Sequence, residues 1–521
     1  MKEIKKLILI VNLIFIVSSC GNPKHGDNEK SNIYQEKYRP QYHFSPPDMW
    51  MNDPNGMVYF EGEYHLFYQY YPDSTIWGPM HWGHAVSTDL LHWQHLPIAL
   101  YPDSLGYIFS GSAVIDFNNT SGFGSADNPP MIAIYTYHNP KLEALGLSNY
   151  QYQSIAYSLD KGRTWVKYHN NPVLLNPGLE DFRDPKVCWH SETEKWIMTL
   201  ATGDHVCFYS SRDLKEWVFE SEFGKNLGAH GGVWECPDLF ELTVDNIQNE
   251  KKWVLLVSMN PGAPNGGSGT QYFIGSFDGH TFTPDKAEIK WIDYGTDNYA
   301  GVTWSNVETR KIFLGWMSNW SYAQKVPTYP WRSALTIPRE LVLTFQNGDY
   351  LIKSKPVDEL NQLLKPLITK GKTIIDKDGI SINLKNDDLS VSVIDININL
   401  QNEEELIIEI SNIIDQKLVL GYNSATGKLY IDRTLAGNSD FDENFAKKIH
   451  EVDIQRVEGS LNIKILLDRS SVEMFFADGL YVMTDLVFPD QDYSSLKIFV
   501  KSGKVWLENL SISAVSSIWN N

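Results

Sequence analysis

The sequence predicts an all-β protein that consists of a five-bladed β-propeller followed by a carboxy-terminal β-sandwich. From Tyr38 to about Pro338, short strand-like runs are separated by Gly, Pro, Asn and Asp, with no long stretch of helical period. Within this region a turn motif recurs at a spacing typical of four-stranded modules. After Pro338 the composition shifts, and strands of alternating apolar and polar residues follow.

The amino-terminal residues predict a leader. Three lysines within residues 1–6 precede the apolar run Leu7 to Val17, which is too short to span a bilayer. The following Val17-Ser18-Ser19-Cys20 resembles a bacterial lipobox, so we expect residues 1–20 to be a lipoprotein signal peptide, with Cys20 as the lipidated residue. An ordinary secretory peptide that contains a cysteine is the alternative. The polar residues 21–37 then form a flexible tether. This predicts an exported protein anchored in the periplasm or at the cell surface.

The propeller prediction, residues 38–338, depends on a repeated turn. The repeats are Ser87 to Trp93, Ser211 to Trp217, Ser276 to Phe282 and the looser Ser158 to Trp165. Each follows a strand and closes a hairpin, and their aromatic residues lie about 50 to 70 residues apart, which suggests five modules in roughly 300 residues. The fifth is expected near residues 302–320. In these repeats Ser and Asp bond turn amides and the Trp packs between blades.

The remainder of the chain predicts a second domain. Fifteen of the 17 tryptophans precede residue 332. Residues 339–360 are expected to be a linker, with a short helix or turn from Pro356 to Leu364. Residues 361–521 are expected to form the β-sandwich, because runs such as Leu389 to Val393 alternate in polarity as half-buried antiparallel strands do.

Composition and charge narrow the classes of partner. The formal net charge is -20, which repels phosphate backbones and argues against nucleic acid or anionic lipid as the main partner. The 17 Trp and 27 Tyr supply flat apolar faces that suit stacking on sugar rings as well as filling cores. Apart from Cys20, the cysteines at 188, 207 and 236 form neither a disulfide framework nor paired Cys/His spacing typical of zinc. A neutral substrate fits best, and no metal is expected.

Three carboxylates occur in short motifs that contain proline. Asp53 lies in Trp50-Met51-Asn52-Asp53-Pro54-Asn55-Gly56, Asp184 in Phe182-Arg183-Asp184-Pro185, and Glu235 in Trp234-Glu235-Cys236-Pro237. Proline restricts the residue before it, and Asn-Gly tolerates positive φ, so each carboxylate is expected in a rigid turn. The three fall in different blades. Because the inner strands of a propeller converge on its axis, the three side chains can share one central funnel.

This set of carboxylates favours glycoside cleavage. The reaction needs one carboxyl to protonate the leaving oxygen and one carboxylate to attack the anomeric carbon. Asp53 is the expected nucleophile. Glu235, between Trp234 and Cys236, has the less polar setting, which suits a general acid/base because desolvation raises a carboxyl pKa. Arg183 is expected to hold Asp184 charged, so that Asp184 binds sugar hydroxyls and stabilises an oxocarbenium-like state.

The motif set resembles glycoside hydrolase family 32, the levanase, inulinase and invertase family. The motifs that carry the resemblance are residues 50–56, Phe67-Tyr68-Gln69, residues 77–83, Phe109-Ser110-Gly111-Ser112-Ala113, residues 182–185 and residues 234–237. The resemblance implies retaining hydrolysis of β-fructofuranosyl bonds in levan, inulin or sucrose, without metal or organic cofactor. It places the nucleophile on Asp53, the acid/base on Glu235 and the transition-state stabiliser on Asp184. It also implies fructosyl contacts from Asn52, Gln69, Trp77, Phe109, Ser110, Arg183 and Trp316.

Three other functions remain open from the sequence. A fructosyltransferase would use the same carboxylates and pass fructose to a sugar instead of water. A sialidase is suggested by the turn from Ser158 to Trp165, although such an enzyme needs several arginines and a Tyr nucleophile. A non-catalytic surface glycan-binding lipoprotein would keep the aromatic platforms without needing an acid and nucleophile pair. Linkage preference and exo or endo attack are not predicted, because both depend on loops around the funnel.

Overall fold

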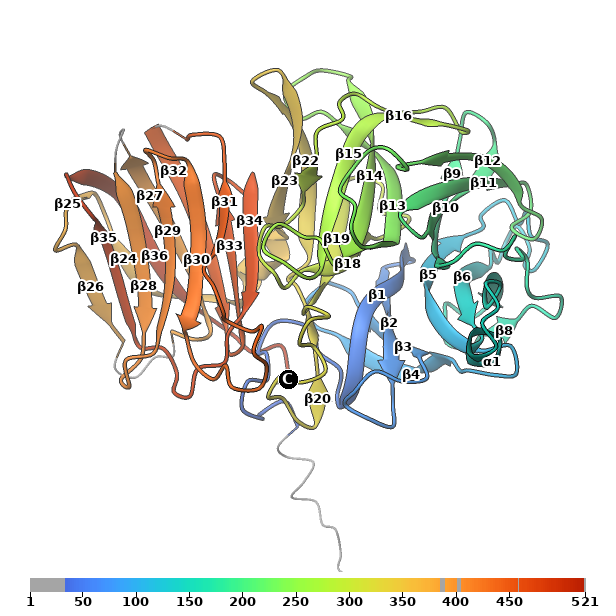
Figure 1. Ribbon diagram of the computed structural model, residues 1–521, viewed down its shortest axis with the longest axis horizontal. Coiled ribbons are helices and arrows are strands. Elements are labelled where there is room, and N and C mark those ends of the chain that lie inside the picture. Colours follow the sequence, from blue (N-terminus) through green and yellow to red (C-terminus); the bar gives the residue numbers. More distant parts are fainter. Residues whose placement is uncertain (1–32, 385–388, 401–403, 458, 520–521) are drawn as a thin grey trace, which may run out of the picture.

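The computed structural model describes residues 33–384, 389–400, 404–457 and 459–519. In these residues strands dominate, and they form two bodies that lie side by side in Figure 1. The expected leader, Cys20 and most of the expected tether lie outside the described residues. Met49 to Pro356 make one body, and Leu364 to Val515 make the other. The all-β prediction is confirmed, and the two bodies are the predicted propeller and sandwich.

Five sheets build the propeller within the described residues. Their innermost strands contact one another in the order β1, β5, β9, β13, β18 and back to β1, so the ring of blades is closed. The first blade consists of β20 (Trp331–Arg332), β1 (Met49–Phe60), β2 (Glu63–Tyr71), β3 (His81–Ser87) and β4 (Gln94–Leu100), and the second of β5 (Tyr107–Ile115), β6 (Met131–His138), β7 (Gln151–Ser158) and β8 (Val166–Lys167). The third consists of β9 (Phe182–His190), β10 (Lys195–Thr202), β11 (His205–Ser211) and β12 (Val218–Phe223).

The last two blades follow in chain order. The fourth consists of β13 (Val233–Thr243), β14 (Lys251–Asn260), β15 (Gly269–Phe277), β16 (Phe282–Pro284) and β17 (Lys290–Trp291), and the fifth of β18 (Tyr299–Thr303), β19 (Lys311–Met317), β21 (Ala334–Leu335), β22 (Arg339–Gln346) and β23 (Asp349–Pro356). The short strand β20 pairs with β1 in parallel, Met49 opposite Trp331. A late segment of the propeller thereby joins the first blade.

The end of the propeller differs from the sequence-based boundary. We expected residues 339–360 to be a linker, but most of them form β22, which pairs with β19, and β23, which pairs with β22, so that the two strands complete the fifth blade. The connection to the second domain is the 3-10 turn η2 (Asp358–Leu363). The boundary was misplaced because alternating strands occur in both domains, and the loss of tryptophan that suggested a new domain begins one hairpin before the propeller ends.

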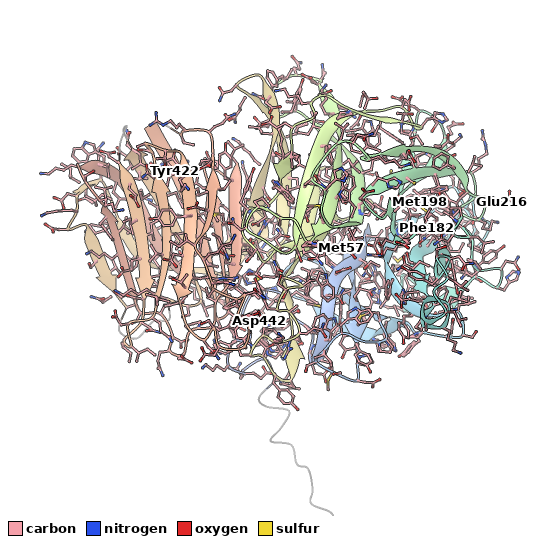
Figure 2. All side chains as sticks on the ribbon, in the orientation of Figure 1. Met57, Phe182, Met198, Glu216, Tyr422 and Asp442 are labelled. Carbon is pink, nitrogen blue, oxygen red and sulfur yellow. The ribbon has the colours of Figure 1, made fainter. Side chains whose placement is uncertain are left out.

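The repeated turns lie between the third and fourth strands of the first four blades. Asp89 Oδ1 accepts hydrogen bonds from the backbone amides of Leu91 and His92, and Asp213 Oδ1 receives the amides at the two equivalent positions. Trp93 stacks on Trp304 with ring centroids 6.3 Å apart, and so connects the first blade to the fifth. Figure 2 shows that Glu216, in the third of these turns, lies at the outer edge of the propeller. The structural roles predicted for Ser, Asp and Trp are therefore confirmed.

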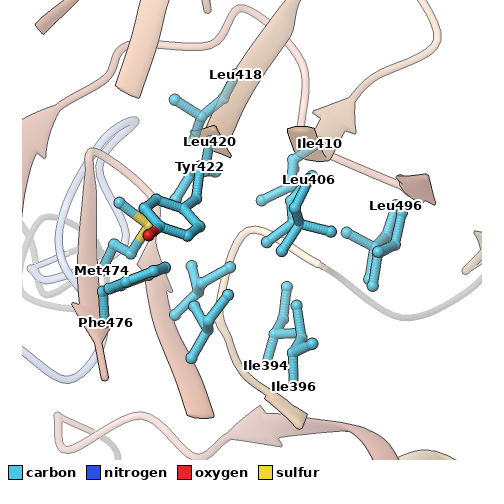
Figure 3. Packing of buried hydrophobic residues seen from close by; sticks show 14 of the residues in the cluster. Ile394, Ile396, Leu406, Ile410, Leu418, Leu420, Tyr422, Met474, Phe476 and Leu496 are labelled. Atoms are coloured by element: carbon cyan, nitrogen blue, oxygen red, sulfur yellow. The ribbon is translucent and has the colours of Figure 1, made fainter. Parts of the chain in front are cut away.

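Two sheets pack face to face in the second domain. Residues from both inner faces form its hydrophobic core, among them Ile394, Leu406, Leu420 and Phe476 in Figure 3. One sheet contains β24 (Leu364–Lys370), β25 (Thr373–Ile375), β36 (Val505–Val515), β27 (Ser392–Leu400), β32 (Gly459–Asp468), β33 (Ser471–Phe476) and β34 (Tyr481–Leu486). The other contains β26 (Ile380–Asn383), β35 (Ser495–Val500), β28 (Glu405–Ser411), β29 (Lys417–Asn423), β30 (Lys428–Leu435) and β31 (His450–Asp453).

Buried charges join the two domains. Arg339, the first residue of β22, donates to Asp293 at 2.9 Å and also binds Glu473 of the sandwich. His43 lies between Glu473, at 2.7 Å, and Asp468, at 2.8 Å. Burial alone would lower the pKa of His43, but the two carboxylates raise it to about 9. Removing one partner from such a network leaves an uncompensated buried charge, which costs about 3–5 kcal/mol. The network therefore favours a single relative orientation of the domains.

Candidate active site

All five innermost strands carry an irregularity at the same end of the propeller. The pairing register shifts at residues 51–54 of β1, 108–111 of β5, 183–186 of β9, 235–238 of β13 and 299–302 of β18. A β-bulge inserts an extra residue and re-aims a side chain, and it accepts proline. The prediction that the three carboxylates lie in rigid turns is thus wrong. Asp53, Asp184 and Glu235 lie at bulges inside strands, where the same residue types are needed as in a turn.

Three of these bulges hold non-glycine residues at positive φ. Asp184 has φ 64°, Cys236 has φ 44° and Ala300 has φ 53°. Such residues cost free energy unless the surrounding structure enforces the conformation, and they are concentrated at functional sites. Here the neighbouring blades hold the three bulges together at one end of the axis. The backbone itself therefore directs the Asp184 carboxylate towards the centre of the ring.

The bulges surround one pocket of about 360 Å³. Its lining includes nine of the residues that the sequence analysis predicted, namely Asn52, Asp53, Gln69, Trp77, Phe109, Ser110, Arg183, Asp184 and Glu235. The Gln69 side-chain nitrogen is buried and has no hydrogen-bond partner among the described residues, so it is free to donate to a ligand. Trp77 is 37% exposed and meets Phe109 edge to face. These residues give the pocket polar donors and an aromatic wall.

Trp316 does not line this pocket. It is fully buried, and its ring packs against Trp50, Tyr299 and Trp320 with centroid separations of 6.2, 6.4 and 4.9 Å. Its place on β19, the second strand of the fifth blade, puts it behind the innermost strand. Trp316 is therefore not among the residues that line the pocket, and the fructosyl contact expected from it stays a prediction that this position does not support.

Asp53 is held by donors on both of its oxygens. Ser110 Oγ donates to Asp53 Oδ2 at 2.7 Å, and Asn52 Nδ2 donates to Oδ1 at 3.0 Å. Asn52 is in turn oriented by Trp50, whose ring N–H donates to Asn52 Oδ1 at 2.7 Å. Burial raises the pKa of Asp53, and the charge of Glu235 raises it further. The donors oppose that rise and keep the carboxylate in one orientation.

Glu235 contacts a cation and a phenol. Arg183 donates from Nη2 to Glu235 Oε1 at 3.0 Å, and the Tyr299 hydroxyl donates to Oε2. Trp234, expected to make the setting of Glu235 less polar, points to the opposite face of β13 and packs in the core between blades. That expectation is wrong because successive residues of a strand face opposite sides. The setting of Glu235 is polar and hydrogen-bonded.

Asp184 differs from the expectation in its partner. Arg183 Nε lies 4.0 Å from Asp184 Oδ2, farther than it lies from Glu235. The closer donor is the backbone N–H of Cys236, at 3.0 Å. Burial raises the pKa of Asp184 to about 7; Arg183 opposes this, and the charges of Glu235 and Asp53 add to it. The pocket thus disfavours three full negative charges at once.

Cys236 lies between two of the carboxylates. Its Sγ is 3.5 Å from Asp53 Oδ2 and 3.6 Å from Asp184 Oδ2. Burial and the neighbouring carboxylates raise the pKa of the Cys236 thiol well above its usual value, so the thiol stays protonated and can donate. Together with the pocket lining, this contact shows that Asp53, Asp184 and Glu235 meet at one place although they are far apart in the sequence.

Several pocket residues were missed by the sequence analysis. They are His138, Glu143, Tyr150, Gln151, Asp181, the Tyr299 hydroxyl and the Cys236 thiol. Four of them come from one connection: His138 ends β6, Glu143 lies in the short helix α1 (Pro140–Ala144), Tyr150 directly precedes β7 and Gln151 begins it. Phe109 stacks on His138 with centroids 4.4 Å apart, which attaches this segment to the pocket wall. No motif marks such loop residues, whereas Asp181, two positions before Arg183, was close to a motif already recognised.

Comparison with known proteins agrees with this architecture. A model of the glycosyl hydrolases family 32 N-terminal domain matches residues 43–356, and a model of the family 32 C-terminal region matches residues 359–514. A levanase of Bacillus subtilis is 47% identical over 502 residues, which are 95% of this chain and 72% of the levanase. An extracellular exo-inulinase of Aspergillus ficuum is 38% identical over an alignment of 518 positions, which covers 94% of this chain and 96% of the relative.

Solved structures show the same likeness. The crystal structure of exo-inulinase from Aspergillus awamori matches with a TM-score of 0.86 and 36% identity, covering 93% of this chain and 100% of that one. The β-fructofuranosidase from Schwanniomyces occidentalis, solved in complex with fructosyl-erythritol, matches with a TM-score of 0.83 and 32% identity, covering 94% of this chain and 99% of that one. The boundary between the two family models falls at the end of β23, where the fifth blade ends.

Proposed function

The chain belongs to glycosyl hydrolase family 32, and from that premise we propose that it is a β-fructosidase that releases fructose from fructans and sucrose by double displacement. The observation that carries the proposal is the meeting of Asp53, Asp184 and Glu235 in one pocket of about 360 Å³. Relatives named levanase and exo-inulinase, similar over nearly the whole chain, support the fructan substrate. The sialidase and glycan-binding alternatives have no comparable support.

In the first step we assign the attack to Asp53. The carboxylate adds to the anomeric carbon of a fructosyl unit while the glycosidic bond breaks, and a covalent fructosyl-enzyme results. The donors on both oxygens, from Ser110 and Asn52, hold the carboxylate in place before the substrate arrives. Such positioning lowers the activation free energy, because the carboxylate loses no further orientational freedom when the reaction begins.

We assign acid/base work to Glu235 and charge stabilisation to Asp184. Glu235 gives a proton to the leaving oxygen, and then takes one from the water that hydrolyses the intermediate. Arg183 and the Tyr299 hydroxyl contact the two Glu235 oxygens and orient them. The Asp184 carboxylate accepts a hydrogen bond from the Cys236 N–H. We assign to it the stabilisation of the positive charge that develops on the fructosyl ring in the transition state.

The shape of the pocket supports removal of terminal units. Beyond the bulges, Lys186 donates to Thr303 O at 2.5 Å and lies 3.2 Å from Asp238 Oδ2, so a buried ion pair crosses the axis. The cavity beyond it, of about 490 Å³, shares no lining residue with the active pocket. We infer that the active pocket is closed at this end and opens only at the other. A blind pocket accepts a chain end and cannot thread the middle of a polymer, which favours exo attack.

Analysis of products over time tests both proposals. With levan, inulin and sucrose as separate substrates, we expect free fructose as the first product from at least one fructan and from sucrose. A ladder of oligomers at early times would contradict exo attack. Predominant oligosaccharide formation from concentrated sucrose would contradict the hydrolase assignment and favour the fructosyltransferase. The relative rates on levan and inulin will give the linkage preference.

We also propose that the protein is exported and anchored by lipid at Cys20. The basic residues, the apolar run and Val17-Ser18-Ser19-Cys20 support this, and the exo-inulinase relative from Aspergillus ficuum is named as an extracellular enzyme. Within the described residues, the structure contains no helix that is long and apolar enough to cross a membrane.

Cell fractionation tests the anchor. We expect the parent in the membrane fraction and Cys20→Ala in the soluble fraction, because the variant has no acceptor for the lipid. Cys188→Ser serves as the matched control, since that thiol lies on β9 inside the propeller. An equal membrane share of parent and Cys20→Ala would contradict lipid attachment at this residue.

A further inference from the structure

A second group of chemically distinctive side chains lies at the outer part of the third blade. His205 and Cys207 are two positions apart on β11, so they face the same side of the sheet. Glu222 on β12 is the direct cross-strand partner of Cys207. One ligand atom from each of the three residues lies within 4.8 Å of the others, and His205 Nε2 is 3.9 Å from Glu222 Oε2. In the sheet order β12-β11-β10-β9 these two strands are the outer ones of the third blade, which Figure 1 shows at the right of the propeller.

The histidine is oriented as a metal ligand would be. Its other ring nitrogen, Nδ1, lies 3.3 Å from Asp204 Oδ1, so the carboxylate can accept the Nδ1–H and leave Nε2 with a free lone pair. Asp204 Oδ2 is in turn 3.5 Å from His230 Nδ1. Histidines that bind metals commonly donate their second nitrogen to a carboxylate, which fixes the tautomer and the ring orientation.

The thiol is also oriented. Cys207 is buried, and its Sγ lies 3.4 Å from Thr202 Oγ1, which contacts the sulfur from the β10 side. Glu222 is the exposed member of the group, and its Oε1 is paired with Lys225 at 2.6 Å. Exposed ion pairs of this kind are weak because solvent screens them, so Lys225 is a weak competitor for the carboxylate.

We propose that His205, Cys207 and Glu222 form a binding site for a zinc-like divalent cation. A thiolate, an imidazole and a carboxylate are the ligand types that Zn²⁺ takes, and three protein ligands leave a fourth position for water. At metal–ligand distances of about 2.0–2.3 Å, tetrahedral ligand atoms are roughly 3.3–3.6 Å apart. The group must therefore contract by about 1 Å, and the exposed Glu222 side chain is the member free to move.

Binding has a defined proton balance. A free cysteine thiol is largely protonated at neutral pH, whereas a metal binds the thiolate. The cation replaces that proton, which passes to solvent, and its affinity must increase as pH rises. No oxidant or reductant is required.

The proposed metal site would stabilise the segment that leads into β13, just before Glu235. The turn between β10 and β11 accepts the backbone N–H of Trp234 at Gly203 O, 2.6 Å away, and Trp234 is the residue before Glu235. His230, which contacts Asp204, stacks on Trp234 with centroids 5.5 Å apart. A cation at His205 would thus hold together the turn and the segment that enters β13. The sequence analysis excluded a zinc site on spacing alone, because Glu222 is 15 positions after Cys207 and no motif connects them.

Cobalt titration of the full chain tests the proposal, since Co²⁺ occupies zinc sites and absorbs strongly when bound to a thiolate. After chelator treatment and dialysis, we expect one equivalent of Co²⁺ with a thiolate-to-metal band, displaced by Zn²⁺, and affinity that increases with pH. Zn²⁺ should also raise the melting temperature of the parent. Absence of the thiolate band in the parent, or absence of displacement by Zn²⁺, would overturn the proposal.

Variants assign the ligands. Cys207→Ser should lose the thiolate band, and Asp204→Asn, which removes the carboxylate that orients His205, should weaken binding about 10- to 100-fold. Cys188→Ser and Cys20→Ser are the controls and should keep the band. Glu222→Gln changes an exposed side chain that the fold does not need, so it provides a ligand variant that folds. A band that survives Cys207→Ser, or unchanged affinity in Glu222→Gln, would exclude these ligands.

Discussion

Replacing Asp53 by Asn lowers kcat on sucrose and fructan by several orders of magnitude while the protein keeps its fold. The amide has nearly the shape of the carboxylate and can still pair with Ser110 and Asn52, so the first-blade bulge is preserved. It cannot add to the anomeric carbon as a nucleophile, and loss of a nucleophile removes the covalent route altogether. Steady-state kinetics and circular dichroism of the two proteins measure the effect.

A nearby carboxylate provides the control for Asp53. Asp48 is exposed, precedes β1 and accepts a hydrogen bond from the Tyr70 hydroxyl, outside the pocket. Asp48→Asn should therefore retain the parental rate. Asp53→Asn with more than about a tenth of the parental kcat would show that Asp53 is not the nucleophile.

Replacing Glu235 by Gln lowers kcat on sucrose about 10²- to 10⁴-fold, the usual contribution of general acid–base catalysis. The amide cannot protonate the leaving oxygen or activate water. An aryl fructoside, whose phenolate leaves without a proton, should form the intermediate at a rate close to that of the parent, and hydrolysis should then be slow. Pre-steady-state kinetics should consequently show a burst of phenol with Glu235→Gln and none with Asp53→Asn.

The same strand supplies the control for Glu235. Glu241 is an exposed residue of β13 that pairs with Lys251 at 2.6 Å, well beyond the bulge. Glu241→Gln should behave as the parent. If Glu235→Gln is equally impaired on the aryl fructoside and on sucrose, with no burst, the proton-donor role is contradicted.

The propeller architecture could be predicted from the sequence because a turn motif recurs at the spacing of a four-stranded blade. Each of the four turns marks a third-to-fourth strand connection, and their spacing over roughly 300 residues leads to five blades, although the fifth blade carries no copy of the turn that the sequence analysis recognised. The position of the last blade was harder to obtain, because β22 and β23 have the same alternation of polar and apolar residues as the sandwich strands. Periodicity identifies a strand, but only the pairing of Arg339 opposite Phe313 shows to which sheet it belongs.

The sequence predicted most residues of the candidate site, but it did not predict the contacts between them. A proline one or two positions after each of the three carboxylates made them recognisable, because a bulge and a turn require the same residue types. The sequence could not show that Arg183 is directed to Glu235 instead of Asp184, or that Tyr299 donates to the same glutamate. Both contacts depend on how blades are placed across the axis. Trp316 was assigned to the pocket by the resemblance, whereas its place on β19 buries it.

The aligned register shifts of the five innermost strands limit how this protein can change. Side chains along a strand alternate between two faces, so deleting one residue at such a position would turn every following side chain of that strand to the opposite face. For β13, the residues that now pack against the third blade, such as Leu239, would be exchanged with those that pack against the fifth, such as Phe240. Changes in chain length are therefore tolerated in the segments that form the rim, such as the one between β6 and β7, and the floor of the pocket can vary only by substitution.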